Sequence, residues 1–93
     1  MSAMKRIRRA VRERRVEFSD HALDEMDDDN LAVEQVKTVL LHGALHARNT
    51  DDRRGVRYIV RGAVDDQDVA VVCRFRGAGL LWIITVYAVS EDE

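Results

Sequence analysis

The sequence predicts an α+β fold, in which two to three N-terminal helices pack on a four-stranded antiparallel sheet. Apolar residues recur at helical spacing as far as Gly43, and after it they alternate with polar residues at period two. The connectors between the alternating segments are short and turn-like, which is typical of an antiparallel meander. The chain has 93 residues, which suits a single domain with one core.

The helices are expected in the first 43 residues. Residues 1–16 form a basic lead helix with a narrow apolar stripe, and residues 19–43 form two further helices. Ser19 is a suitable N-cap, which puts His21 in the first turn of the second helix. Gly43 is the natural end of the third helix. The apolar face of that helix is formed by Val33, Val36, Val39 and Leu40.

The sheet is expected over residues 44–89, and an acidic tail at 90–93 completes the single domain. Alternation gives one continuously apolar face, which takes the helices and includes Tyr58, Val71 and Trp82. The expected strands are 44–48, 56–62, 68–76 and 80–87. The opposite, open face is mixed and carries Arg57, Arg61, Arg74, Arg76, Thr85 and Tyr87.

Cysteine usage and hydropathy favour a cytoplasmic protein. The single cysteine, Cys73, excludes an intramolecular disulfide, so a reducing compartment is expected. The longest apolar run, residues 80–89, is about half as long as a membrane-spanning helix. The basic start of the chain is not followed by an apolar stretch, so we expect no signal peptide.

The net charge of −2 conceals a separation of charge along the chain. Residues 5–15 hold seven basic side chains and one acid, whereas residues 17–29 hold seven acids and no lysine or arginine. A second group of arginines lies in the C-terminal half. Nucleic-acid binding depends on the local field, so an acidic total does not exclude it.

Neither a metal nor a cofactor is expected. His42 and His46 have H-x3-H spacing, but Gly43 ends the helix between them, and no further Cys or His cluster completes a ligand set. The acidic run at residues 27–29 lacks the spacing of a calcium loop. Cys73 alternates with apolar neighbours, which indicates a buried strand thiol.

Several short motifs resemble a small bacterial family of unknown function, whose pattern is H-A-x-x-R-M-x-x-R-x-I, then a helix and a glycine, then I-T-V-Y. The resemblance extends over residues 5–89, and that family in turn resembles the MqsR and RelE toxins of toxin–antitoxin systems, so the expected fold is RelE/MqsR-like. The matching features are His21-Ala22, Met26, the helix bounded by Val36 and Gly43, an aspartate-rich turn before an arginine–tyrosine strand, and Ile84-Thr85-Val86-Tyr87.

This resemblance implies metal-independent cleavage of RNA and inhibition by a cognate antitoxin, often of the zinc-finger type. It also implies helices on a four-stranded antiparallel sheet, in agreement with the pattern above. Two arginines of the family pattern fall on Glu25 and Asp29, so two expected cations are anions in this chain. Leu31 replaces the isoleucine conservatively.

RNA cleavage without a metal requires a base for the 2′-hydroxyl, cations for the phosphate and an acid for the leaving oxygen. His21 is the candidate base or acid, because imidazole titrates near neutral pH. Tyr87 is a candidate to supply a hydroxyl or to stack a base. The candidates for stabilising the phosphate are Arg57, Arg61 and Arg74. The candidates for binding RNA are Arg12, Arg15, Arg53, Arg54 and Arg76.

Structural explanations stay open beside these roles. His21 can be a helix-start residue whose ring hydrogen-bonds a strand, and the strand arginines can be a solvated face. The arginines of the lead helix can grip RNA, dock an acidic antitoxin segment or confer solubility. Two functions therefore follow: a toxin-like RNA endonuclease held inactive by its antitoxin, or a non-catalytic protein- or RNA-binding domain of the same fold.

Overall fold

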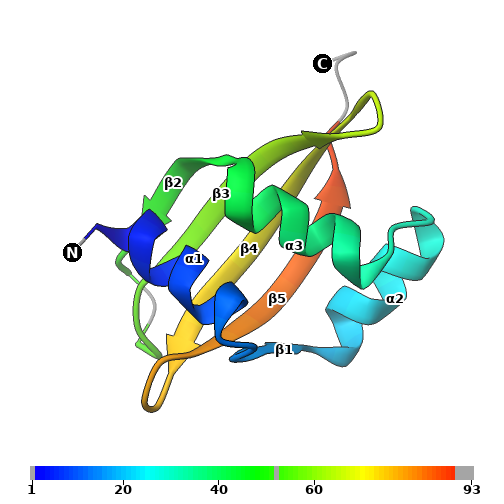
Figure 1. The fold of residues 1–93 in the computed structure, drawn as a ribbon. Coiled ribbons are helices and arrows are strands. Elements are labelled where there is room, and N and C mark those ends of the chain that lie inside the picture. Colours follow the sequence, from blue (N-terminus) through cyan, green and yellow to red (C-terminus); the bar gives the residue numbers. More distant parts are fainter. Residues whose placement is uncertain (1, 52, 90–93) are drawn as a thin grey trace.

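The computed structural model describes residues 2–51 and 53–89 and confirms the α+β class (Figure 1). The predicted acidic tail, residues 90–93, lies outside the described residues. The elements, in chain order, are α1 (Ala3–Arg12), β1 (Val16–Phe18), α2 (Asp20–Asp28), α3 (Val33–His42), β2 (Ala44–Asn49), β3 (Arg57–Val64), β4 (Gln67–Arg76) and β5 (Leu80–Ala88).

Within the described part of the chain, the sheet has five strands in the order β1-β5-β4-β3-β2. Strands β2 to β5 pair antiparallel as predicted, but β1 pairs parallel with β5, so the sheet is mixed. The prediction of a purely antiparallel, four-stranded sheet was wrong in this respect. The missed strand has three residues, which is too short for an alternating pattern to identify it. Val16 pairs with Leu81, and Phe18 pairs with Ile83.

The lead helix is shorter than expected, because it ends at Arg12 instead of residue 16. Arg14 adopts a φ of 60°, in the left-handed region, which turns the chain out of the helix. The backbone N–H of Arg15 then donates to Ala10 O at 2.8 Å, and its C=O accepts from Leu81 N at 2.8 Å. This turn leads directly into β1 beside β5.

The helices cover one side of the sheet and bury a single core. In Figure 1, α1 and α3 cross one face, and α2 lies along the β5 edge. Each fully buried aliphatic side chain contributes about 1.5–3 kcal/mol through removal of apolar surface from water. The largest side chains with less than 2% exposure are Ile7, Leu40, Leu81, Ile83, Val36, Val39, Val60, Val69, Val71 and Val86.

The predicted faces are confirmed for β3 and β4 but not for all of β5. Tyr58, Val60, Val71 and Cys73 are buried under the helices as expected. On β5, alternation assigned Trp82 to the helix-covered face, and this was wrong: it pairs across the sheet with Arg74 on the open face.

A bulge in β5 explains this error. Cys73 pairs with Ile83, whereas the preceding Val72 pairs with Thr85, so Ile84 is an extra residue in the ladder. An extra residue reverses the side to which the following side chains point. Leu81 and Ile83 therefore face the core before the bulge, whereas Val86 faces it afterwards.

Candidate functional site

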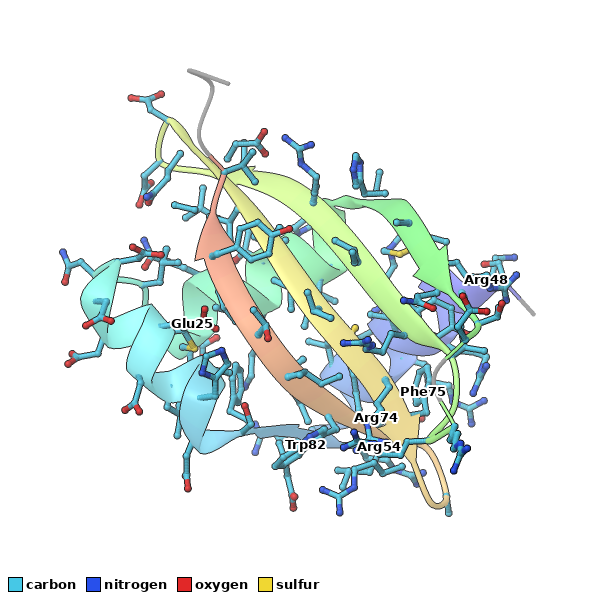
Figure 2. All side chains as sticks on the ribbon, turned by 180° about the vertical axis from the view of Figure 1, so that it is seen from behind. Glu25, Arg48, Arg54, Arg74, Phe75 and Trp82 are labelled. Carbon is cyan, nitrogen blue, oxygen red and sulfur yellow. The ribbon has the colours of Figure 1, made fainter. Side chains whose placement is uncertain are left out.

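The open face of the sheet carries a group of arginines around Trp82 at one end. Arg74 pairs with Trp82 across β4 and β5, and the register of β3 with β4 places Arg57 opposite Arg74. The guanidinium carbon of Arg76 lies 4.7 Å from the centroid of the Trp82 ring. Figure 2 shows Arg74 and Trp82 together at this end of the sheet. Arg57, Arg74, Arg76 and Trp82 are called the open-face arginine cluster below.

The chemistry of this cluster suits an anionic ligand with flat, apolar parts. Guanidinium groups bind phosphate oxygens through paired N–H donors. The Trp82 ring is only partly buried, and the stacked Arg76 holds it in place. Arg74 Nη1 donates to Arg54 O at 3.3 Å, which anchors the loop before β3 to the cluster. On the other side of Trp82, Glu17 of β1 pairs with it and contributes a negative charge beside the cluster.

The predicted phosphate-binding arginines lie at two separate ends of the open face. Arg61 is four residues from Arg57 along β3, which corresponds to about 13 Å at the rise of a strand. Arg61 Nη2 lies 2.6 Å from Asp68 Oδ2, so its charge is largely compensated. Tyr87 belongs to the same end as Arg61, because both pair with Ala70 from opposite sides.

His21 occupies the first turn of α2, as predicted, and Ser19 is its N-cap, accepting from Ala22 N at 2.9 Å. The His21 side chain is 67% exposed, and its Nε2 lies 3.3 Å from Glu25 Oε1, one turn along the same helix. Strand spacing puts β3, which carries Arg57, about 10 Å from β5. The structure thus brings His21, on α2, to the β5 edge of the sheet. Arg74 lies one strand further in, on β4, and Arg57 lies beside it on β3, two strands from β5.

Glu25 and Asp29 bind the outer edge of β5, a role that the sequence did not reveal. Because β1 ends at Phe18, the second half of β5 continues beyond its strand neighbour on that side. Glu25 Oε1 accepts from Val86 N at 3.2 Å, and Asp29 Oδ2 accepts from Ala88 N at 3.2 Å. Backbone N–H groups need acceptors, which an arginine side chain does not provide. The two anions in place of arginines therefore have a structural explanation.

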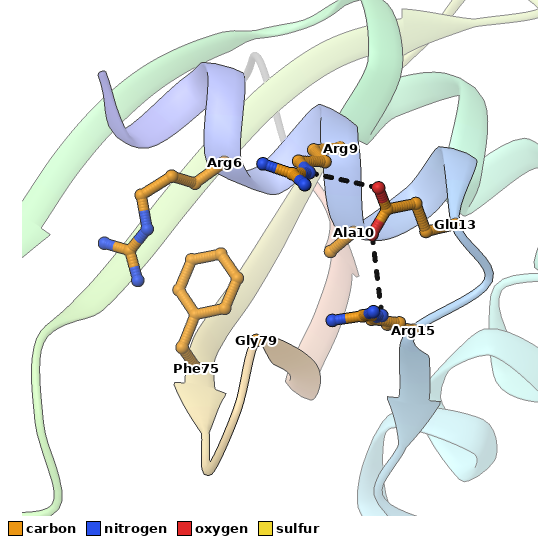
Figure 3. Close-up of a pocket in the computed structure, with 7 residues that line it drawn as sticks. All are labelled: Arg6, Arg9, Ala10, Glu13, Arg15, Phe75 and Gly79. Atoms are coloured by element: carbon orange, nitrogen blue, oxygen red, sulfur yellow. Dashed lines mark hydrogen bonds and ion pairs between the residues drawn. The ribbon is translucent and has the colours of Figure 1, made fainter. Parts of the chain in front are cut away.

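A second group of cations lines a cleft between α1 and the β4–β5 hairpin, with a volume of about 380 Å³ (Figure 3). The guanidinium carbon of Arg6 lies 4.3 Å from the centroid of the Phe75 ring. The lining residues are Arg6, Arg9, Ala10, Glu13, Arg15, Phe75 and Gly79. This cleft is called the α1–hairpin cleft below. Of its arginines, sequence reasoning singled out Arg15 alone, because helical spacing does not reveal which exposed residues meet the hairpin.

Glu13 organises two of the arginines in the α1–hairpin cleft. Glu13 Oε2 lies 3.0 Å from Arg9 Nε, and Oε1 lies 3.5 Å from Arg15 Nε. The hydrogen bond from Arg9 is the main reason that the pKa of the Glu13 carboxyl is below its ordinary value, and the charges of Arg9 and Arg15 add to the effect. Glu13 is therefore ionised at neutral pH and holds the two guanidinium groups on either side of it.

The remaining candidates lie on α1, in the loop before β3 and in the core. Arg12 lines a depression on α1 together with Lys5, Arg8 and Arg9. Arg53 is exposed in the loop before β3. Cys73 is buried, and burial raises the pKa of its thiol to about 12, which keeps it protonated.

The described residues contain neither a candidate metal-binding cluster nor a candidate membrane-spanning helix. Residues 2–51 and 53–89 contain no group of three or more His, Cys, Asp or Glu that is arranged to hold a metal ion. Across this same part of the chain, no helix combines the length and hydropathy needed to cross a membrane.

The fold and the site define a small α+β domain with a mixed sheet, one helix-covered face and cations on both sides of the β4–β5 hairpin. The chain belongs to the family described as "Domain of unknown function (DUF4258)", which matches residues 18–88. Neither curated proteins nor solved structures gave a match. The matched segment includes the open-face arginine cluster, whereas the arginines of the α1–hairpin cleft precede it.

Proposed function

We propose that this protein is a toxin-like domain that binds single-stranded RNA through the open-face arginine cluster. The stack of Arg76 on Trp82, beside Arg74, is the observation that supports this proposal. Single-stranded RNA is bound by grooves or faces that combine cations for the phosphates with aromatic rings for the bases. A bound base extends the existing stack, and the neighbouring guanidinium groups contact the adjoining phosphates.

The test is binding of a fluorescently labelled, single-stranded RNA, followed by anisotropy. Trp82→Ala is expected to weaken binding about 5- to 150-fold, from the 1–3 kcal/mol that one base–aromatic stack contributes. Arg74→Ala is expected to weaken binding and to lower its salt dependence, because it removes a cation that contacts phosphate. Arg61→Ala is the matched comparison, because it removes an arginine from the same face whose charge Asp68 already balances. Equal affinity of the wild type, Trp82→Ala and Arg74→Ala would refute the proposal.

A second candidate function is metal-independent cleavage of the bound RNA by His21. The observation that favours it is the exposed imidazole, held 3.3 Å from the Glu25 carboxylate beside the sheet. In this reaction the imidazole removes the proton of the 2′-hydroxyl, and the 2′-oxygen attacks the phosphorus. The bond between phosphorus and the 5′-oxygen breaks, and a water molecule gives a proton to the leaving 5′-oxygen. The arginines of the open face then stabilise the negative charge that develops on the phosphate.

Binding and cleavage are separated by two variants in one assay. If the protein cleaves RNA, His21→Ala abolishes cleavage and leaves RNA binding intact, whereas Trp82→Ala weakens both. If the protein only binds RNA, the wild type leaves total RNA intact over the same period. Undiminished cleavage by His21→Ala rules out the catalytic role of the imidazole.

Inhibition by a cognate antitoxin is part of the same proposal. A cytoplasmic location is also part of it, because the RNA that the protein would bind is found there. We expect induction of the gene alone to arrest growth, and co-expression of the neighbouring chromosomal gene to relieve the arrest. An antitoxin, of zinc-finger or other type, acts by occupying the cationic surfaces. Absence of arrest, together with RNA binding in vitro, supports a binding domain without toxin activity.

A further inference from the structure

We propose that bound RNA does not end at the open face but continues around the tip of the β4–β5 hairpin into the α1–hairpin cleft. This inference rests on the proposed function and extends it, because it makes both sides of the hairpin one binding site. The second half of this site lies on residues N-terminal to the family match, together with Phe75.

Two arginine–aromatic stacks lie on opposite sides of the same hairpin. Phe75 and Arg76 are neighbours in β4 and point to opposite faces of the sheet. On the open face, Arg76 stacks on Trp82 at 4.7 Å, and on the helix side Arg6 stacks on Phe75 at 4.3 Å. Nucleobases stack on guanidinium planes as well as on aromatic rings. Each side of the hairpin therefore offers a position for one base.

Arg15 connects the two sides. It lines the α1–hairpin cleft, and it also lines a depression of about 780 Å³ at the hairpin tip, together with Glu17, Arg76, Gly77, Ala78 and Leu80. Arg15 Nη1 donates to Ala78 O at 3.3 Å, so its guanidinium is fixed beside the tip. The tip consists of small residues, Gly77, Ala78 and Gly79, which leave room for the RNA chain to cross from one side to the other.

The charge in the α1–hairpin cleft fits a phosphate. Three guanidinium groups and one carboxylate leave two positive charges. Glu13 engages Nε of Arg9 at 3.0 Å and Nε of Arg15 at 3.5 Å. The carboxylate thereby orients both side chains beside the cleft, as the two dashed lines in Figure 3 show. Terminal guanidinium nitrogens are the usual donors to phosphate oxygens.

The test compares a short single-stranded RNA with a longer one, of about 4 and about 12 nucleotides, within the range of sites on small binding domains. Arg9→Gln and Phe75→Leu are expected to weaken binding of the long RNA at least fivefold and to leave the short RNA within twofold of wild type. The salt dependence gives a second readout, because each lost phosphate contact lowers the slope of log K against log salt by about 0.7 for single strands. Arg9→Gln lowers that slope for the long RNA only.

Lys37→Gln is the matched control, since it removes one positive charge from α3, outside both cavities. Thermal unfolding of each variant confirms that it is folded. If Arg9→Gln binds the long RNA as tightly as Lys37→Gln does, the path through the cleft is overturned while open-face binding stands. If Trp82→Ala also leaves the short RNA unaffected, the proposed function itself fails.

Discussion

Glu25 Oε1 accepts a hydrogen bond from the backbone N–H of Val86 at 3.2 Å, which ties α2 to the outer edge of β5. Asp29 repeats the contact one turn later, at Ala88 N. The spacing of four residues along the helix matches the spacing of two along the strand, so both carboxylates reach alternate N–H groups of one edge. An acidic helix therefore serves as the neighbour that β1 is too short to provide.

We expect Glu25→Ala to lower the free energy of unfolding by about 1–2 kcal/mol, because Val86 N loses its acceptor in a partly buried position. Glu25→Gln keeps an oxygen acceptor and is expected to lose less than half of that amount. Urea denaturation measures both variants. Hydrogen exchange at the Val86 amide should accelerate in the alanine variant, and identical exchange in wild type and Glu25→Ala would contradict this role.

Cys73 makes stability fall at alkaline pH. In the folded protein burial raises the pKa of its thiol from 9.0 to about 12, so between these values an unfolded chain ionises the thiol and the folded chain does not. The unfolded state is thereby favoured as pH rises, by at most about 1.4 kcal/mol per pH unit. The unfolding free energy of wild type minus that of Cys73→Ala should shrink between pH 8 and pH 10. A constant difference would show that the thiol is not protected.

Gly43 allows α3 to end against β3. Its φ of −77° is open to any residue, so the requirement is steric. A Cβ at this position would overlap Arg61 O and lie 2.5 Å from Val39 O, both of them backbone atoms. We expect Gly43→Ala to destabilise the protein by about 3 kcal/mol, the upper end of overpacking effects. A Cβ at Gly62 would lie 3.2 Å from its nearest neighbour, Gly43 Cα, so Gly62→Ala should destabilise the protein less. The order of the urea midpoints of the two variants checks this expectation.

The sequence predicted those parts of the fold in which a hydrophobic pattern repeats over many residues. The helical stripe ending at Gly43 and the alternation in β3 and β4 span enough residues to identify each element. The sequence did not predict β1 or the side chains' faces in the first half of β5, because both depend on local geometry. β1 has three residues and pairs parallel with the distant β5, and one extra residue at Ile84 reverses the faces of Leu81 and Trp82. Neither a short parallel pairing nor a bulge leaves a periodic signal.

The candidate site was predictable where it depended on strand alternation. Arg57, Arg74 and Arg76 lie on the open face as expected, and Trp82 joins them because of the bulge. The placement of His21 beside Glu25, away from β3, depended on where α2 packs, which a single sequence does not specify. The same holds for the stack of Arg6 on Phe75, since it joins α1 to β4.

Trp82 provides a direct report on the open face, because it is the chain's single tryptophan. Its ring is partly exposed and lies under Arg76, so a base that stacks there should quench its fluorescence. Titration with single-stranded RNA is expected to give saturable quenching whose midpoint rises with salt. Arg76→Ala should shift that midpoint to higher RNA concentration, whereas Lys37→Gln, on the helix side, should leave it unchanged. Binding seen by anisotropy without any change in Trp82 emission would place the RNA elsewhere on the molecule.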